Sequence, residues 1–305
     1  MNVMPEAYGV FARDDNYIYR TEAQLAWGNG VNSLGLIIML NPGSSKLKSK
    51  TLWEDIEDKK INIAQGELEL DETMKAVANI LHDSHPKLDG VLHIRNLFNI
   101  RDSDANSALE LYGKYCAGTI TADEKLMHTD FETLLTATTG RPMLLDPTNP
   151  WIWLAWTVED KRFLNKRKEK VWKLCNKLSD VELFAIYSQA KKFENSRGSI
   201  HTYHPLPRNS NNKAKYRADM GALMKEYWKK SMIKEKIYVV AMSDDEAYVL
   251  LKRGDSYALK YNGVDPQQAD WVEGNGLVVS VDVKDVSGYY QWFDPPKPYI
   301  IAKNK

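Results

Sequence analysis

The chain has 305 residues, of which 43% are hydrophobic and 27% charged, a composition that excludes a disordered chain and allows one large domain plus a small one. Its 41 basic residues balance its 41 acidic ones, so bulk charge gives no argument for nucleic-acid binding and any basic surface must be local. No apolar run reaches the ~18 residues of a membrane span, and the start lacks a secretory signal. We therefore expect a cytoplasmic protein with no membrane contact.

The first part of the chain alternates apolar runs with helical patterns. Residues 16–27 are typical of a strand or hairpin. Residues 34–40 form a continuous apolar run without alternation, which indicates a central parallel strand buried on both faces. A turn cluster, Asn-Pro-Gly-Ser-Ser, ends that run. We expect residues 51–83 to be largely helical and residues 90–94 to form a second short strand.

The same alternation continues to about residue 233. The predicted elements are helix-like spacing over 104–136, strand candidates at 143–145 and 151–156, a basic amphipathic helix over 159–178, a strand at 181–187 and a helix over 212–233. Strands that alternate with helices imply βαβ units. The sequence therefore predicts an α/β domain over residues 1–233, with three α/β/α layers around a mainly parallel central sheet.

The pattern changes near residue 236. Short apolar strands such as 236–242, 247–251 and 276–281 follow one another, separated by turn residues. This pattern favours a small antiparallel β domain over residues 236–305. Its residues leave three roles open: a DNA-gripping accessory, a partner-binding module or an oligomerisation unit. The sequence does not indicate an oligomeric state.

Three polar clusters directly follow predicted strands, the third of them after the short segment 199–203. They are Leu40-Asn41-Pro42-Gly43, Arg95-Asn96-Leu97 and His204-Pro205-Leu206-Pro207. Each alone is ordinary turn chemistry, because Pro fixes φ and Gly supplies positive φ. In parallel sheets, however, ligands bind beyond the C-terminal ends of the strands. The shared position of the clusters therefore predicts one site built around Asn41, Asn96 and His204.

Together the segments LIIMLNPGSS, GVLHIRNLFNIR and YHPLPRNS resemble the three motifs of the uracil-DNA glycosylase superfamily. The Asn-Pro-Gly at the first motif is most similar to the mismatch-specific and thymine-DNA glycosylase branch. The chain also resembles a poorly characterised bacterial and phage domain family, through Tyr19-Arg20, LNPGSS, NLFN and HPLPR. The resemblance spans about residues 17 to 225 and leaves the C-terminal strands unexplained.

The resemblance implies a DNA glycosylase that flips a modified or mismatched base and hydrolyses its N-glycosidic bond, in DNA repair or in antiviral defence against phage with modified DNA. Asn41 would hold the attacking water, Asn96 would recognise the base, and His204 would stabilise the departing base anion. The fast uracil-specific enzymes have Asp where this chain has Asn41, and Asn cannot act as a general base. A base from elsewhere, such as Glu54 or Asp55, would then be needed.

Further residues fit the same interpretation. Phe98 and Trp53 are expected to stack on the base, with core packing as the alternative for both, and Gly43 would let the backbone approach it closely. Arg208 stands where the family often has a Leu that wedges into the duplex, and a surface phosphate contact is its alternative role. The expected DNA contacts around the motif loops are Ser44, Ser45, Lys46, Lys48, Arg208, Asn209 and Lys213. The basic helix over 159–178 is a further possible phosphate-binding surface, or a solvated face.

The sequence predicts neither a metal site nor a cofactor. The pairs His82/His85 and His201/His204 lack a third ligand at useful spacing, and there is no Gly-rich phosphate loop. Two other function classes stay open. The chain could be a binding module that recognises a base or nucleotide without cutting it, or a hydrolase of small nucleosides.

Overall fold

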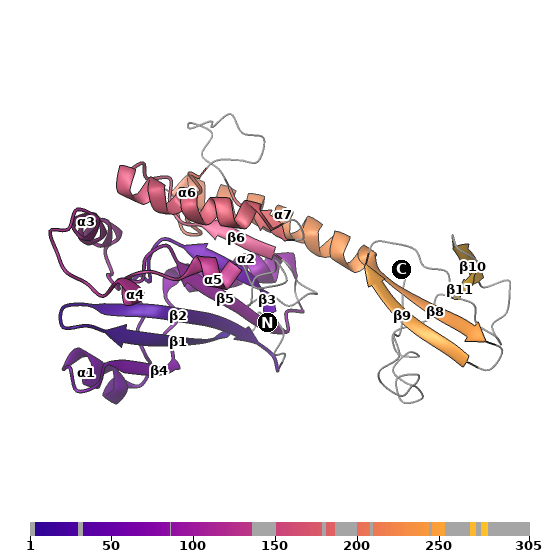
Figure 1. Ribbon diagram of the computed structural model, residues 1–305, viewed down its shortest axis with the longest axis horizontal. Helices are drawn as coiled ribbons and strands as arrows, with labels where there is room; N and C mark the ends of the chain where they lie inside the picture. The colour runs from indigo at the N-terminus through magenta and orange to yellow at the C-terminus, as the bar shows by residue number, and fades with distance from the viewer. Residues whose placement is uncertain are drawn as a thin grey trace. The chain divides into compact units, whose positions relative to one another are not determined.

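The computed structural model describes residues 4–29, 33–85, 87–135, 151–178, 181–186, 200–207, 210–243, 246–253, 269–272 and 276–279. None of the helices in these ranges is long and apolar enough to cross a membrane. Figure 1 labels the elements. In chain order they are β1 (Glu6–Arg13), β2 (Ile18–Trp27), β3 (Ser33–Met39), α1 (Lys50–Glu57), β4 (Ile63–Glu67), α2 (Glu72–Ser84), β5 (Gly90–Asn96), α3 (Ala105–Cys116), α4 (Glu124–Met127), α5 (Phe131–Leu135), β6 (Trp151–Ala155), α6 (Arg162–Asn176), β7 (Glu182–Phe184), α7 (Ser210–Lys234), β8 (Glu235–Ser243), β9 (Glu246–Arg253), β10 (Ala269–Val272) and β11 (Gly276–Val279).

A seven-stranded mixed sheet organises the first part of the chain, with strand order β4-β1-β2-β5-β3-β6-β7. The pairings β5–β3, β3–β6 and β6–β7 are parallel, whereas β4–β1, β1–β2 and β2–β5 are antiparallel. The fold class is thus α/β, as predicted, but the structure does not confirm a mainly parallel sheet. The antiparallel half consists of strands whose pairing partners the sequence pattern did not reveal.

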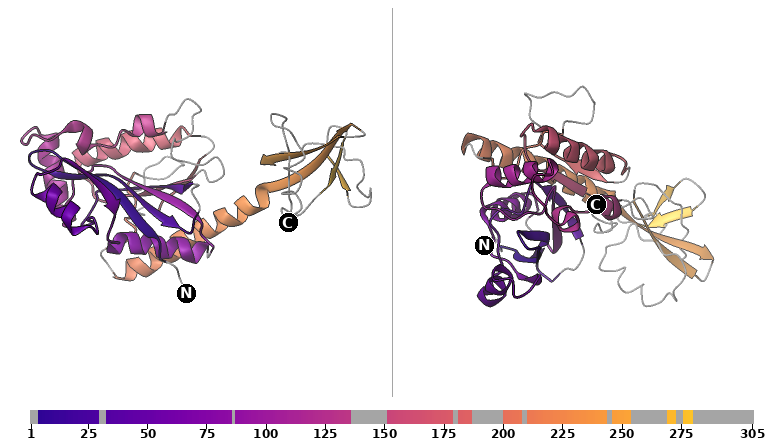
Figure 2. Two further views of the ribbon diagram at one scale, coloured as in Figure 1. Left: turned by 90° about the horizontal axis from the view of Figure 1, so that it is seen from below. Right: turned by 60° about the vertical axis from the view of Figure 1, so that its left-hand side comes forward.

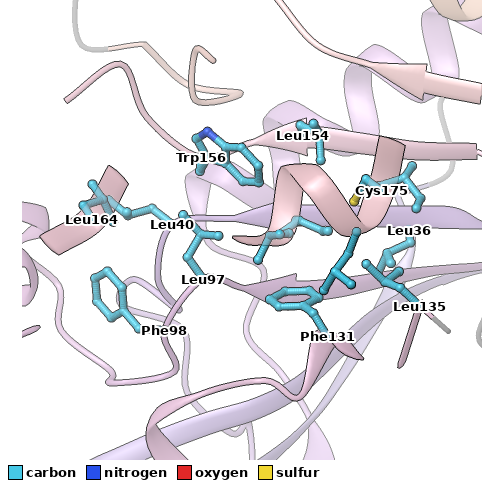
Figure 3. Close-up of a cluster of buried hydrophobic side chains, with 14 of the residues drawn as sticks. Leu36, Leu40, Leu97, Phe98, Phe131, Leu135, Leu154, Trp156, Leu164 and Cys175 are labelled. Atoms are coloured by element: carbon cyan, nitrogen blue, oxygen red, sulfur yellow. The ribbon is translucent and has the colours of Figure 1, made fainter. Parts of the chain in front are cut away.

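A cluster of buried hydrophobic side chains lies on one face of the parallel strands (Figure 3). Leu36 and Ile38 of β3 and Leu154 of β6 belong to it, together with side chains from α3, α5 and α6. Every residue of β3 is buried, as its continuous apolar sequence predicts for a strand covered on both faces.

Helices α2 and α7 cover the opposite face of the sheet, which the left-hand view of Figure 2 shows. The Nε1 of Trp153 in β6 donates to the hydroxyl of Tyr216 in α7 at 3.1 Å. Arg217 of α7 donates to Asp83 of α2 at 2.7 Å. Helices therefore lie on both faces of the parallel strands, and the loops that connect them emerge at the sheet's edges.

Most predicted elements of the first part are present with shifted ends. The prediction for 51–83 is wrong in its middle, because the edge strand β4 separates α1 from α2. The sequence analysis missed β1, which pairs with both β2 and β4. The predicted strand at 143–145 lies outside the described residues.

The chain divides into two compact units, Met1–Met224 and Lys225–Lys305. In the second unit β8, β9, β10 and β11 form an antiparallel sheet in the order β10-β11-β8-β9. The predicted strands at 236–242 and 247–251 correspond to β8 and β9. A separate β domain over 236–305 stays a prediction, because much of that range lies outside the described residues.

Candidate functional site

The three motifs lie at the same edge of the sheet. Strands β3, β5, β6 and β7 are parallel, so their C-terminal ends share one edge. Asn41 follows β3 and Asn96 ends β5. The Tyr203 amide donates to the Ile186 carbonyl just beyond β7 at 2.9 Å, which places the loop of His204 at this edge as well.

The connections around β3 diverge at this edge. After β3 the chain proceeds to α1 and α2, whereas after β5 and β6 it proceeds to the helices of the core cluster on the opposite face. Loops that leave neighbouring parallel strands toward opposite faces open a crevice between them, where α/β proteins bind ligands. The topology thus favours a site beside the β3 end, at Asn41.

The loop after β3 packs against a carboxylate that the sequence analysis missed. Gly43 has a φ of +68°, and a Cβ at this position would lie 3.6 Å from Oδ2 of Asp71. Asp71 is the N-cap of α2, and its Oδ1 accepts from the Met74 amide at 2.8 Å. The half-buried Asn41 donates through Nδ2 to the Asp102 carbonyl at 3.3 Å. A carboxylate therefore stands at the first motif, although Asn41 itself cannot take a proton.

Asn96 is almost fully buried, with 2% of its surface exposed. Its Oδ1 has no hydrogen-bond partner among the described residues. Buried acceptors are nearly always satisfied, since leaving one unpaired costs about 1–3 kcal/mol. Asn96 is thus able to accept a hydrogen bond from a ligand N–H at the end of β5.

The ring of His204 is half-buried. Its Nδ1 lies 3.2 Å from the Leu206 amide nitrogen and 3.4 Å from the Leu206 carbonyl oxygen. In the tautomer with the proton on Nε2, Nδ1 accepts from the Leu206 N–H, and in the tautomer with the proton on Nδ1 it donates to the Leu206 carbonyl. Burial lowers the pKa of His204 below 6.5, while the Leu206 backbone contact and the Asp71 carboxylate oppose that shift. The Asp71 charge thus acts on the third motif, while its carboxylate lies beside Gly43 of the first.

Arg20 of β2 belongs to the Tyr19-Arg20 match of the sequence analysis, which gave it no role, and it is a further candidate site residue. It is fully buried, and its Nη1 donates to Ser45 Oγ. Arg101 holds the same loop, donating to the Ser45 carbonyl at 2.9 Å and the Ser44 carbonyl at 3.0 Å. Burial, with the charges of Arg101 and Arg95, lowers the pKa of Arg20 to about 10, and Asp71 opposes that shift. Two arginines and Asp71 therefore surround the loop after β3.

The two aromatic residues proposed for base stacking are packing residues. Phe98 is fully buried in the core cluster of Figure 3, and its ring stacks on Tyr112 at a centroid distance of 4.4 Å. Trp53 is 7% exposed, with the Arg101 guanidinium 4.7 Å from its ring centroid and Phe11 at its edge. Core packing, the alternative for both, therefore describes them in this structure.

The expected DNA-binding residues are only partly consistent with a basic rim. Lys46 pairs with Glu69 at 3.6 Å and Lys48 with Glu67 at 2.9 Å, so their charge is compensated. Ser45 is buried under Arg20, whereas Ser44 and Lys213 are exposed. Arg208 and Asn209 lie outside the described residues.

The basic helix α6 uses two of its cations internally. Arg167 donates to the carbonyls of Leu97 at 3.0 Å and Thr129 at 2.6 Å. Lys168 is fully buried and donates to the carbonyls of Thr157 and Glu159. These two side chains therefore bind backbone carbonyls around α6.

The general bases suggested from sequence are surface residues in ion pairs. Glu54 lies 3.6 Å from Lys50, and Asp55 lies 3.2 Å from Lys60. Within the described ranges no group of three or more His, Cys, Asp or Glu side chains could hold a metal ion. Asp71 is the carboxylate that the fold places beside Gly43.

A separate hollow of about 380 Å³ lies over β1, β2 and β4. Its lining residues are Tyr8, Gly9, Val10, Glu22, Ala23, Gln24, Gln65 and Gly66. It contains no residue of the three motifs. The candidate site is therefore the sheet edge, where the buried polar side chains Asn96 and Arg20 lie.

Comparisons with known protein families, with characterised proteins and with solved structures found no match to this chain. The resemblance to the uracil-DNA glycosylase superfamily thus rests on the three short motifs and stays a hypothesis.

Proposed function

We propose that the chain is a DNA glycosylase-like hydrolase that takes a modified or mismatched base into the edge site and cleaves its N-glycosidic bond. The observation that carries this proposal is the gathering of three groups at one sheet edge: the Asn41–Gly43 loop, the unpaired Oδ1 of Asn96, and His204, linked to the loop through Asp71. The proposal includes a uracil-DNA glycosylase-like arrangement of the first unit and a small β domain over 236–305.

The residue chemistry supplies each step. Asn96 Oδ1 accepts from an N–H of the extruded base. As the bond between sugar and base breaks, the base leaves with the electron pair, and the proton on Nε2 of His204 hydrogen-bonds its developing negative charge. The sugar cation is attacked by water held at Asn41, and the proton of that water passes to Asp71 or to solvent. Asp71 replaces Glu54 and Asp55 as the proposed carboxylate.

The test is incubation of the full chain with single-stranded and duplex oligonucleotides that carry uracil, G·T mismatches or modified cytosines, followed by alkali. Strand breaks at one class of base are expected. His204→Ala should slow cleavage about 100-fold or more, the usual loss when a donor to a developing anion is removed. His82→Ala, at the end of α2, is the control. Absence of breaks on every substrate overturns the proposal.

One observation favours a second function, a binding module that does not cleave. Asn41 cannot remove a proton and its Nδ2 is engaged by the Asp102 carbonyl. Saturable binding of a base-containing oligonucleotide without turnover identifies this function. Cleavage of free nucleosides without DNA affinity instead identifies a small-molecule hydrolase, a result consistent with the compensated charges of Lys46 and Lys48.

A further inference from the structure

Two hydrogen-bond donors of the Arg20 side chain have no acceptor among the described residues. Its side chain is 0% exposed. Its Nη1 donates to Ser45 Oγ, while Nε and Nη2 lack a partner in the described part of the chain. The Nε–H and one Nη2–H lie on the same side of a guanidinium, where they form the fork that fits two oxygens of one phosphate or carboxylate.

Other buried arginines in the first unit are satisfied. Arg13 of β1 donates through Nη1 to the carbonyls of Ile56 at 2.6 Å and Glu57 at 3.0 Å, and through Nε to Asp14 O at 3.0 Å. Arg95 pairs with Glu22 at 3.1 Å. An uncompensated buried cation is costly, and proteins pair such groups or use them to bind ligands. Arg20 therefore differs from Arg13 and Arg95, because two of its donors have no acceptor among the described residues.

A β-bulge directs Arg20 into this position. Val10 pairs with Glu22 and Phe11 pairs with Arg20, so Thr21 is an extra residue in β2. A bulge reverses which face the following side chains occupy, and such bulges often aim a side chain at a functional site. It places Arg20 on the same face as Phe11, which packs against Trp53 of α1.

The surroundings of Arg20 favour an anion. Arg101, beside the same loop, and Arg95 place positive charge near it, and Asp71 supplies a single opposing charge. Arg95 is paired with Glu22, and the Glu57 and Asp102 carboxylates act on Arg101, so Asp71 is the carboxylate that acts on Arg20 itself. The Ser45 hydroxyl accepts from Arg20 and keeps its own hydrogen to donate to a ligand.

We propose that Arg20 is the anchor of a phosphate-binding site, in which Nε and Nη2 donate to two oxygens of one phosphate group and Ser45 donates to a third. The phosphate comes either from a free nucleotide or from a nucleic-acid backbone. Arg20 and Ser45 are both buried, and Arg101 holds the backbone of the Ser44–Ser45 segment, so this segment must shift to admit the ligand. The inference goes beyond the proposed function, because phosphate binds whether or not a base is cleaved.

The test uses the full chain at constant ionic strength, with chloride as the reference anion. Inorganic phosphate, a nucleoside 5′-monophosphate, the matching nucleoside and a short oligonucleotide are titrated by calorimetry, and thermal unfolding is followed in parallel. We expect saturable phosphate binding and a higher Tm with phosphate than with chloride. If the monophosphate binds more tightly than the oligonucleotide, a free nucleotide is the source of the phosphate. If the oligonucleotide binds more tightly than the monophosphate, the source is the nucleic-acid backbone.

Arg20→Lys retains the charge and loses the fork, so it should weaken phosphate binding at least tenfold. Arg13→Lys is the matched control, because Arg13 is a buried arginine on the adjacent strand whose donors already meet carbonyls. His204→Ala should keep phosphate binding while losing cleavage, which separates this proposal from the proposed function.

A measurement on the unaltered chain covers the case in which Arg20→Lys does not fold. In protein labelled with ¹⁵N-arginine, phosphate should shift one Nε–H resonance strongly, and that resonance should be the one that Arg13→Lys and Arg101→Lys both retain. The proposal is overturned if no phosphate-containing probe binds more tightly than chloride, or if Arg13→Lys weakens binding as much as Arg20→Lys does.

Discussion

At the scale of single residues, two of the side chains that carry buried polar atoms without a partner, Arg20 and Asn96, belong to the candidate site. The interior cations Arg13, Arg167 and Lys168 all donate to backbone carbonyls. By contrast, Asn96 and Arg20 carry donors or acceptors that no described residue meets. Because such atoms lower stability, their presence at the C-terminal edge of the sheet argues for a ligand that completes them.

Replacing Asn96 by Ala should separate function from stability. The change removes an unpaired buried Oδ1, so we expect the free energy of unfolding to change by less than about 1 kcal/mol, below the ~2 kcal/mol or more typical of truncating a satisfied core residue. Affinity for a base-containing oligonucleotide should fall about tenfold, the loss of one good hydrogen bond. Denaturant unfolding and a binding titration measure the two effects.

Asn99→Ala is the matched control, because the Asn99 side chain bonds the Leu126 carbonyl and Thr129. It should destabilise the fold and leave affinity unchanged once the protein is folded. If Asn96→Ala costs as much stability as Asn99→Ala and leaves affinity unchanged, Asn96 is a structural residue.

The sequence predicted the motif residues but missed their partners, for physical reasons. Asn41 and Asn96 stand out because each follows an apolar run that reads as a strand, and His204 stands out through its His-Pro-Leu-Pro sequence. Arg20 lies within a half-polar strand, and its inward direction depends on the bulge at Thr21, which the residue pattern does not reveal. Asp71 has the ordinary signature of a helix N-cap, so nothing in it signals its contact with Gly43.

At the scale of elements, prediction succeeded where a strand is buried on both faces. β3 and β6 read as continuous apolar runs and lie centrally in the sheet. The sequence of β4, Ile-Ala-Gln-Gly-Glu, offers little apolar surface, and its strand character comes from pairing with β1. Pairing between distant segments is not encoded in local pattern, and for this reason β1 and β4 were missed although β2 was predicted.

The parallel strands pack closely enough that one added methyl group should disrupt them. Gly35 of β3 has a φ of +152°, and a Cβ there would lie 2.3 Å from the Trp151 ring of β6. Gly35→Ala should therefore lower the free energy of unfolding by about 3 kcal/mol or more, since neither the ring nor the central strand can yield cheaply. Urea unfolding followed by tryptophan fluorescence measures it.

Gly118→Ala tests the backbone cost alone. Gly118 has a φ of +71°, and a Cβ there would meet nothing within 4 Å. Its expected cost is the ~1 kcal/mol of a left-handed alanine. Equal losses for the two variants would show that the contact with Trp151 is unimportant.

Asp71 caps the start of α2 and also lies beside the candidate site. Asp71→Asn separates these two roles, because it keeps a capping side chain and removes the charge. Asn caps helices about as well as Asp, so the free energy of unfolding should change by less than about 1 kcal/mol. The Asp71 charge raises the pKa of His204 against the effect of burial, so its removal should lower that pKa further. A proton NMR titration of the His204 ring reports the change.

The control is Asp104→Asn, which alters the N-cap of α3 in the same way. It should leave the pKa of His204 unchanged. An unchanged His204 pKa in Asp71→Asn as well would remove the electrostatic link between the first and third motifs.

At the scale of the whole molecule, several histidines are held neutral by the fold. Burial, with the charge of Arg95, lowers the pKa of His93 to about 4. Burial, with the charges of Arg167 and Lys170, lowers the pKa of His128 to about 4, and its Nε2 contacts the Tyr112 hydroxyl at 3.0 Å. In the unfolded chain each histidine titrates near its ordinary value of about 6.5.

The unfolded chain therefore binds more protons than the folded chain between pH 6.5 and pH 4, and the stability that neutral histidines provide is lost as the pH falls through that window. We expect the free energy of unfolding to drop by about 2 kcal/mol from pH 6.5 to 4.5, after allowing for solvent screening of these partly exposed rings. Urea unfolding at half-unit pH steps measures the slope. The double variant His93→Gln/His128→Gln should flatten it, whereas His82→Gln, the control for replacing a histidine, should not. A slope that the double variant leaves unchanged would assign the acid sensitivity to other groups.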